Sequence, residues 1–161
     1  MDNWLQIVAA PLLVALGGLA AWFIQSRVEQ VRATEERLTA ERRKVYAEIL
    51  EPYIRMFAGV KSGEGVKEAT EKILSFEYRK TSFELGLVGS DDVVRAYNDM
   101  MQFFFKAANE DGQDSSQGIL LWGALLLEIR RSLGNKDTKL DALDMLRCMI
   151  TDIERLQTRS S

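Results

Sequence analysis

Residues 3–26 read NWLQIVAAPLLVALGGLAAWFIQS and contain no charged side chain. A run of about 20 apolar residues is long enough to cross the roughly 30 Å hydrocarbon core of a bilayer as a helix. Trp4 and Trp22 stand near the two ends of the run, as interfacial aromatic residues do in membrane spans. The residues before it include Asp2 and no Lys or Arg, which is atypical of a cleaved signal peptide. The sequence therefore predicts an uncleaved transmembrane helix over residues 1–26.

Basic residues follow the predicted span and none precedes it; the first of them are Arg27, Arg32, Arg37, Arg42, Arg43 and Lys44. Positively charged segments next to a span stay on the cytoplasmic side of the membrane. The sequence therefore predicts a single-pass protein of the cell inner membrane, with its N-terminus outside and its C-terminal domain in the cytoplasm. A cytoplasmic domain also suits the single cysteine, which has no partner for an intrachain disulfide.

The composition of the 161-residue chain excludes several classes of function. The chain has no histidine, which removes the catalytic and zinc-binding arrangements that depend on that residue. Its formal net charge of −3 argues against a generic nucleic-acid coat, which needs a large basic excess. Neither a glycine-rich phosphate loop nor a nucleophile elbow is present. We therefore predict that the protein is not an enzyme and carries neither a cofactor nor a metal.

The predicted span has bulky side chains on one face and mostly small side chains on the other. Small residues let helix backbones approach closely, and Gly17-x-x-x-Ala21 has the small-xxx-small form. A lone span cannot enclose a pore, so a transport role requires self-association, whereas a plain membrane anchor does not. The predicted pore-lining or helix-packing residues are Gln6, Ala10, Leu13, Gly17 and Ala21.

A heptad-like pattern continues beyond the predicted span. Spacings of four and three residues alternate along what we call the heptad seam, which consists of Ile24, Val28, Val31, Glu35, Leu38, Arg42, Val45 and Ile49. This spacing is typical of helices that associate with one another. The charged residues Glu35 and Arg42 could set the register or line a wet interior. The pattern predicts a stalk helix over residues 27–57 that holds several copies in register.

Residues 58–161 predict a cytoplasmic helical domain, so the predicted fold class is all-α. An apolar stripe over residues 46–57 is expected to bury against the helices that follow. Turn signals occur at residues 61–65 and 85–89. Ser90 directly follows the second of these turns and has the character of a helix N-cap.

The C-terminal third of the chain predicts two more helices. Residues 118–127 form an apolar run too short to cross a bilayer, which predicts a buried core helix. Gly134 has the character of a helix C-terminal glycine. Residues 138–141 have the Thr-x-x-Asp spacing of a capping box, which predicts a last helix with a buried face over residues 140–156. Cys148 lies on that face and is predicted to be a core or boundary residue.

Basic side chains are the candidates for binding an anionic ligand. In a symmetric oligomer, each inward-facing Arg becomes a ring of like charges that an anion or an acidic ring must offset. The alternative is a solvated helix face with partial ion pairing. The predicted anion-binding residues are Arg37, Arg42, Arg43, Lys44, Arg79, Lys80, Arg130 and Arg131.

Three short segments accompany the single N-terminal span: ERRKVY at residues 41–46, VGSDDVV at residues 88–94 and RRSLG at residues 130–134. In this layout the chain resembles small bacterial membrane proteins that act as effectors in anti-phage defence. In particular, it is similar to the channel effector of Hailong-type systems. The resemblance implies a homotetrameric ion channel that is held shut by short DNA oligomers, which a partner nucleotidyltransferase makes.

The sequence features and the resemblance to anti-phage effectors together predict that the protein is a homo-oligomeric membrane effector that forms an ion channel or pore. A nucleotide or oligonucleotide signal, bound in a basic cytoplasmic vestibule, is predicted to control it. Two alternatives stay open. The chain could be a single-pass membrane anchor, or it could be a regulatory protein that presents a helical partner-binding domain.

Overall fold

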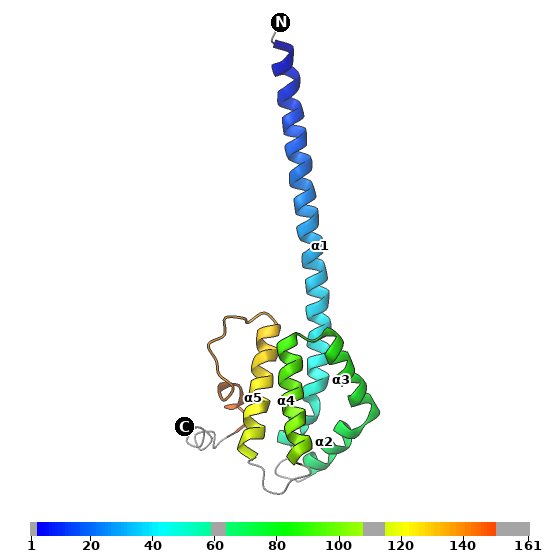
Figure 1. Cartoon of the computed structure of the whole chain (residues 1–161), viewed down its shortest axis with the longest axis vertical. Coiled ribbons are helices and arrows are strands. Elements are labelled where there is room, and N and C mark those ends of the chain that lie inside the picture. The colour runs from blue at the N-terminus through cyan, green and yellow to red at the C-terminus, as the bar shows by residue number, and fades with distance from the viewer. Residues whose placement is uncertain (1–2, 59–63, 108–114, 151–161) are drawn as a thin grey trace. The chain divides into compact units, whose positions relative to one another are not determined.

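The computed structural model describes the backbone of residues 3–58, 64–107 and 115–150, and side chains within these ranges from Trp22 onward, except those of Glu64 and Ser115. Over these residues the chain forms α helices and one short 3₁₀ helix, without a β-strand, which confirms the predicted all-α class. The elements are α1 (Asn3–Ala58), α2 (Glu64–Leu74), α3 (Phe76–Val88), α4 (Asp91–Ala107), α5 (Ser115–Ser132) and η1 (Asp144–Leu146) (Figure 1).

The chain divides into two compact units, Met1–Ala40 and Glu41–Ser161. The first unit holds the N-terminal part of α1. The second holds the C-terminal part of α1 together with all the later helices. The division falls inside the predicted stalk, residues 27–57, because the C-terminal part of that segment contributes buried side chains to the core of the second unit.

Among the residues whose side chains are described, no helix is long and apolar enough to cross a membrane. The predicted span, residues 1–26, lies mostly outside that part of the chain and stays a prediction. The same holds for the predicted packing residues of the span, which are Gln6, Ala10, Leu13, Gly17 and Ala21.

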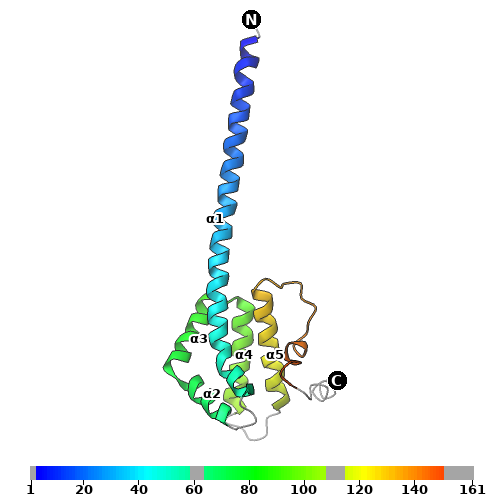
Figure 2. The ribbon, with the colours of Figure 1, turned by 180° about the vertical axis from the view of Figure 1, so that it is seen from behind.

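The core of the second unit forms around the C-terminal part of α1. Tyr46, Ile49 and Tyr53 are buried there, so the predicted stripe over residues 46–57 does face the later helices, although Ile54 is 54% exposed. Fully burying one such apolar side chain contributes about 1.5–3 kcal/mol. The partners from the other elements include Leu85, Val93, Tyr97, Met100, Trp122, Leu125, Ile129 and Leu146. In both views of the ribbon, α3 and α5 lie on opposite sides of α4 (Figures 1 and 2).

The sequence predicts one helix from about Val66 to the turn signal at residues 85–89, but the structure interrupts it at Ser75. The side chain of Ser75 accepts a hydrogen bond from the backbone N–H of Tyr78 at 3.2 Å, as a helix N-cap does, and α3 starts at the next residue. Because a new helix begins here, α2 and α3 are separate elements, and the sequence pattern missed this break. The break predicted over residues 85–89 is confirmed, since α3 ends at Val88 and α4 begins at Asp91.

The C-terminal segment differs from its prediction. Gly134 follows α5 with a positive φ of 111°, as predicted for a helix end. The predicted long last helix is wrong over residues 140–150, which contain only η1. The carboxylates of Asp141 and Asp144 accept hydrogen bonds from each other's backbone N–H groups, at 2.7 and 3.1 Å, so the capping box forms three residues later than predicted and only η1 follows it. Residues 151–156 of the predicted helix lie outside the described residues. Cys148 is exposed rather than part of the core.

Candidate anion-binding cleft

One polar cleft of the second unit brings together two of the predicted anion-binding residues, Arg42 and Arg131. It has a volume of about 330 Å³. Arg42 comes from α1 and Arg131 from the last turn of α5. The cleft is completed by Ser90, Asp92, Glu128, Ser132 and Lys136. It therefore lies where α1, the start of α4 and the end of α5 meet.

Arg42 ties α1 to the end of α3. Its Nε donates a hydrogen bond to the backbone carbonyl of Val88, the last residue of α3, at 2.6 Å. The last carbonyl groups of a helix lack partners within that helix, and a cation is favourable beside them. The Nε hydrogen bond uses one of the five N–H donors of the guanidinium group. Arg42 therefore has a structural role and still has donors for an anion in the cleft.

Tyr46 fixes the backbone around the cleft. Its hydroxyl accepts a hydrogen bond from the backbone N–H of Ser90 at 3.1 Å, and it shares a second hydrogen bond with Oγ of Ser132 at 2.8 Å. Tyr46 itself is buried, so these two bonds are partly shielded from water. The buried ring thus holds the α3–α4 turn and the end of α5 at fixed positions relative to α1.

The charges of the cleft are mixed, with three basic and two acidic side chains. Arg131 forms an ion pair with Glu128, and the exposed Asp92 lies 3.7 Å from Arg95. Lys136 is exposed and forms no ion pair within the described residues. Lys136 is therefore the most accessible cation of the cleft. The sequence pattern does not single out Lys136, because it lies in an irregular segment, and only the glycine at position 134 predicts that the chain changes direction there.

The other predicted basic residues are not gathered in this cleft. Arg43 and Lys44 are exposed on α1, and Arg37 belongs to the first compact unit. On α3, Arg79 is exposed and Lys80 lies 3.8 Å from Glu84. Arg130 donates a hydrogen bond from Nε to Oγ1 of Thr138 at 3.1 Å.

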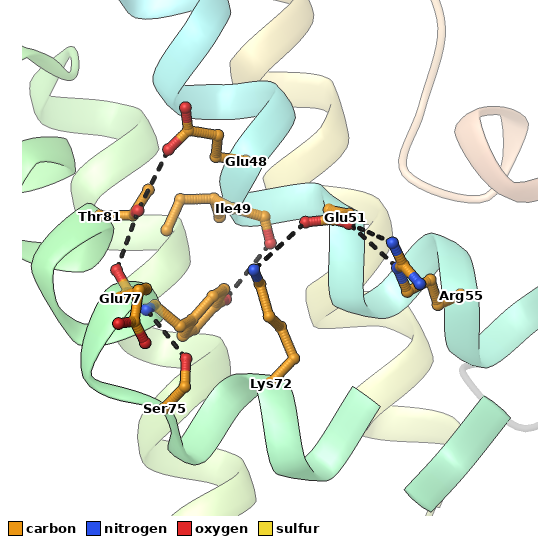
Figure 3. Close-up of polar contacts among 9 residues, drawn as sticks. Glu48, Ile49, Glu51, Arg55, Lys72, Ser75, Glu77 and Thr81 are labelled. Carbon is orange, nitrogen blue, oxygen red and sulfur yellow. Dashed lines mark hydrogen bonds and ion pairs between the residues drawn. The ribbon is translucent and has the colours of Figure 1, made fainter. Parts of the chain in front are cut away.

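Polar contacts also join α1 to α2 and α3 (Figure 3). Glu51 lies 3.8 Å from Lys72 and 2.7 Å from Arg55, and its hydrogen bond with Arg55 is the main cause that lowers its pKa. Oγ1 of Thr81 donates a hydrogen bond to Glu48 at 3.2 Å. These contacts are structural, because each side chain has a partner within the bundle.

A second cavity, of about 430 Å³, is lined by apolar side chains that include Tyr53, Phe57, Phe103 and Trp122. The Nε1–H group of Trp122 is buried and has no hydrogen-bond partner among the described residues. A buried donor without a partner costs free energy, so a group with an oxygen acceptor would be favourable beside it. Elsewhere in the described ranges, no three acidic or cysteine side chains lie together as a metal site would require.

The described part of the chain thus defines an α-helical bundle with a polar cleft of mixed charge. The first helix of this bundle, α1, begins at Asn3. No family model, curated protein or solved structure matches the chain significantly.

Proposed function

We propose that this protein is a homo-oligomeric membrane effector that forms an ion channel, with the N-terminal segment as its span. An anionic nucleotide or short oligonucleotide, bound at the cleft of Arg42, Arg131 and Lys136, controls the channel. A tetramer, a role in anti-phage defence and a partner nucleotidyltransferase are what the resemblance implies.

The observation that carries this proposal is the exposed N-terminal part of the heptad seam. Ile24, Val28 and Val31 are between 46% and 63% exposed, and Leu38 is 36% exposed. No described residue of the same chain covers them. Apolar side chains at heptad spacing are typical of a helix that packs against copies of itself. A second copy of α1 would remove this apolar surface from water.

The continuity of α1 supports control by a ligand. A single helix from Asn3 to Ala58 carries the predicted span, the exposed seam residues and Arg42. A ligand that binds one packing of α1 more tightly than another shifts the population towards that packing. A shift from a 1:99 to a 99:1 ratio would require about 5.5 kcal/mol of differential binding. A polyanion that engages Arg42 together with the two other cations is suited to such selective binding.

The proposal is tested on the full-length protein in detergent and in liposomes. Native mass spectrometry should give an integer multiple of the chain mass, and liposomes containing the protein should pass ions. Short single-stranded DNA oligomers should change the flux. Lys136→Glu should raise the DNA concentration for the half-maximal effect about tenfold, or about 1.4 kcal/mol. Lys139→Glu, at an exposed position outside the cleft, is the matched control.

The outcomes separate the parts of the proposal. A protein that is monomeric in detergent and passes no ions in liposomes would overturn the proposal that it forms a channel. An oligomer that conducts ions but ignores DNA, in both the parent protein and the Lys136 variant, would overturn only the proposed ligand.

The second candidate function is a membrane anchor or regulatory protein that presents a partner-binding domain. The apolar cavity lined by Tyr53, Phe57, Phe103 and Trp122 favours it, because a partner's apolar side chain would fit there. An anchor should tolerate replacement of residues 4–25 by an unrelated hydrophobic span. A channel should lose its conductance after the same replacement.

A further inference from the structure

Glu128 places a carboxylate inside the candidate anion-binding cleft. It lines the cleft together with Arg131, and the two side chains form an ion pair between Oε1 of Glu128 and Nη1 of Arg131. They are three positions apart on α5, a spacing that puts two side chains on the same face of a helix. The Glu128 side chain is only 22% exposed. Arg131 therefore already has a negatively charged partner within its own chain.

The other two cations of the cleft have no carboxylate partner. Arg42 donates from Nε to the backbone carbonyl of Val88, which is a neutral group, and Lys136 is exposed. No ion pair joins either of them to an acidic side chain of the described residues. The charges of these two cations are therefore available to an anion, whereas Glu128 offsets much of the charge of Arg131.

The second carboxylate of the cleft, that of Asp92, has a weaker influence. Its side chain is 70% exposed, and it pairs at 3.7 Å with Arg95, which does not line the cleft. Water and salt screen the interactions of exposed charges strongly and those of partly buried charges much less. Glu128 should therefore lower the affinity of the cleft for anions more than Asp92 does, although each carries one negative charge.

We propose that Glu128 is an intramolecular competitor, whose carboxylate occupies Arg131 until an anionic ligand displaces it. This inference rests on the proposed function, since it concerns the ligand of the same cleft. An anion that contacts only Arg131 exchanges one negative partner for another and gains little. An anion that also contacts Arg42 and Lys136 gains the attraction of two cations without a carboxylate partner. The cleft thereby favours a polyanion with several phosphate groups.

DNA binding by two charge-neutralising variants of the full-length protein in detergent tests the competition. Glu128→Gln and Asp92→Asn each remove one negative charge from the cleft, so both change the net charge of the chain equally. The probe is a short single-stranded DNA oligomer, and isothermal titration calorimetry at constant salt gives its dissociation constant. Glu128→Gln should bind the oligomer about tenfold more tightly than the parent, and Asp92→Asn less than about threefold more tightly. Thermal unfolding checks that both variants fold as the parent does.

Each of the other outcomes overturns the proposal. Equal affinities of the parent and the Glu128 variant would show that this carboxylate does not compete with the ligand. Weaker binding by the Glu128 variant would show that the carboxylate contacts the ligand itself. In both cases the proposed function survives, because the cleft still binds DNA. The absence of binding in all three proteins would overturn both the competition and the proposed ligand.

Discussion

At the residue scale, buried tyrosine hydroxyls are the groups most sensitive to their surroundings. Tyr78 and Tyr53 are both 3% exposed. The hydroxyl of Tyr78 donates to the backbone carbonyl of Ile49 at 3.3 Å, and that of Tyr53 donates to Sδ of Met101 at 3.4 Å. Burial raises the pKa of both tyrosines well above its usual range, because the phenolate would lose its hydration. The folded chain therefore keeps both phenols protonated.

The raised pKa values predict a loss of stability at alkaline pH. Above about pH 10 the tyrosines of the unfolded chain lose their protons while Tyr53 and Tyr78 of the folded chain keep theirs, so the unfolded state binds fewer protons. The free energy of unfolding should therefore be unaffected by these groups below about pH 10. Above that pH it should fall by up to about 1.4 kcal/mol per pH unit for each of the two tyrosines.

Denaturant unfolding of the parent protein and of Tyr78→Phe, measured between about pH 8 and pH 11, checks this expectation. The variant should lose about 1 kcal/mol at neutral pH with its hydrogen bond to Ile49. Above about pH 10 its stability should fall less steeply with pH than that of the parent. Equal slopes for the two proteins would show that Tyr78 does not keep its proton in the folded state.

At the element scale, Ser75 decides where α3 begins. Its side chain accepts the N–H of Tyr78, and Tyr78 packs in the core. Ser75→Ala should therefore lower the free energy of unfolding by about 1 kcal/mol, as the loss of an N-cap does. Ser75→Asp should keep most of the stability, since its carboxylate can accept the same hydrogen bond. Chemical denaturation of the three proteins measures the difference, and an alanine variant as stable as the parent would contradict the capping role.

The same element shows why the sequence predicted some helices and missed others. The core face of α1 and the core helix α5 follow from the spacing of apolar residues such as Tyr46, Ile49 and Trp122, because burial on one face creates that spacing. Ser75 stands between Leu74 and Phe76, so the apolar pattern of the sequence continues across the break between α2 and α3. The N-cap role of Ser75 can be recognised only from its hydrogen bond with Tyr78 in the structure. The Thr138-x-x-Asp141 spacing predicts a capping box at the wrong place, because Asp141 is the first rather than the last residue of the box that forms and pairs with Asp144.

The cleft could be predicted only in part for a similar reason. Arg42 and Arg131 were identified from charge, which is visible in the sequence. Their meeting depends on the hydrogen bonds of Tyr46 to two distant elements, and no local pattern encodes these. Lys136 joins them through the turn after α5, in which the backbone N–H groups of Gly134 and Asn135 donate to the carbonyls of Arg131 and Arg130. The close approach at Gly123, where a Cβ would lie 2.3 Å from the carbonyl oxygen of Ala142, is likewise invisible in the sequence pattern.

At the scale of the whole molecule, the heptad seam divides into a buried part and an exposed part, which the sequence presents as one pattern. Val45 and Ile49 are buried within the second compact unit. Val31 and Leu38, in the first unit, are exposed. The C-terminal part of the seam therefore stabilises the fold of one chain. The N-terminal part makes no such contribution among the described residues, and under the proposed function a second copy of α1 covers it.

Matched alanine variants on the two parts should separate folding from association. Ile49→Ala should lower the free energy of unfolding by about 2–5 kcal/mol, because it leaves a cavity in the core. Val31→Ala should change the unfolding of the bundle by less than about 0.5 kcal/mol, as exposed substitutions do. It should nevertheless weaken self-association, because the apolar contact between copies becomes smaller. Thermal unfolding together with native mass spectrometry across a dilution series in detergent measures both quantities. A Val31 variant that dissociates at the same concentration as the parent would show that this part of α1 does not hold the copies together.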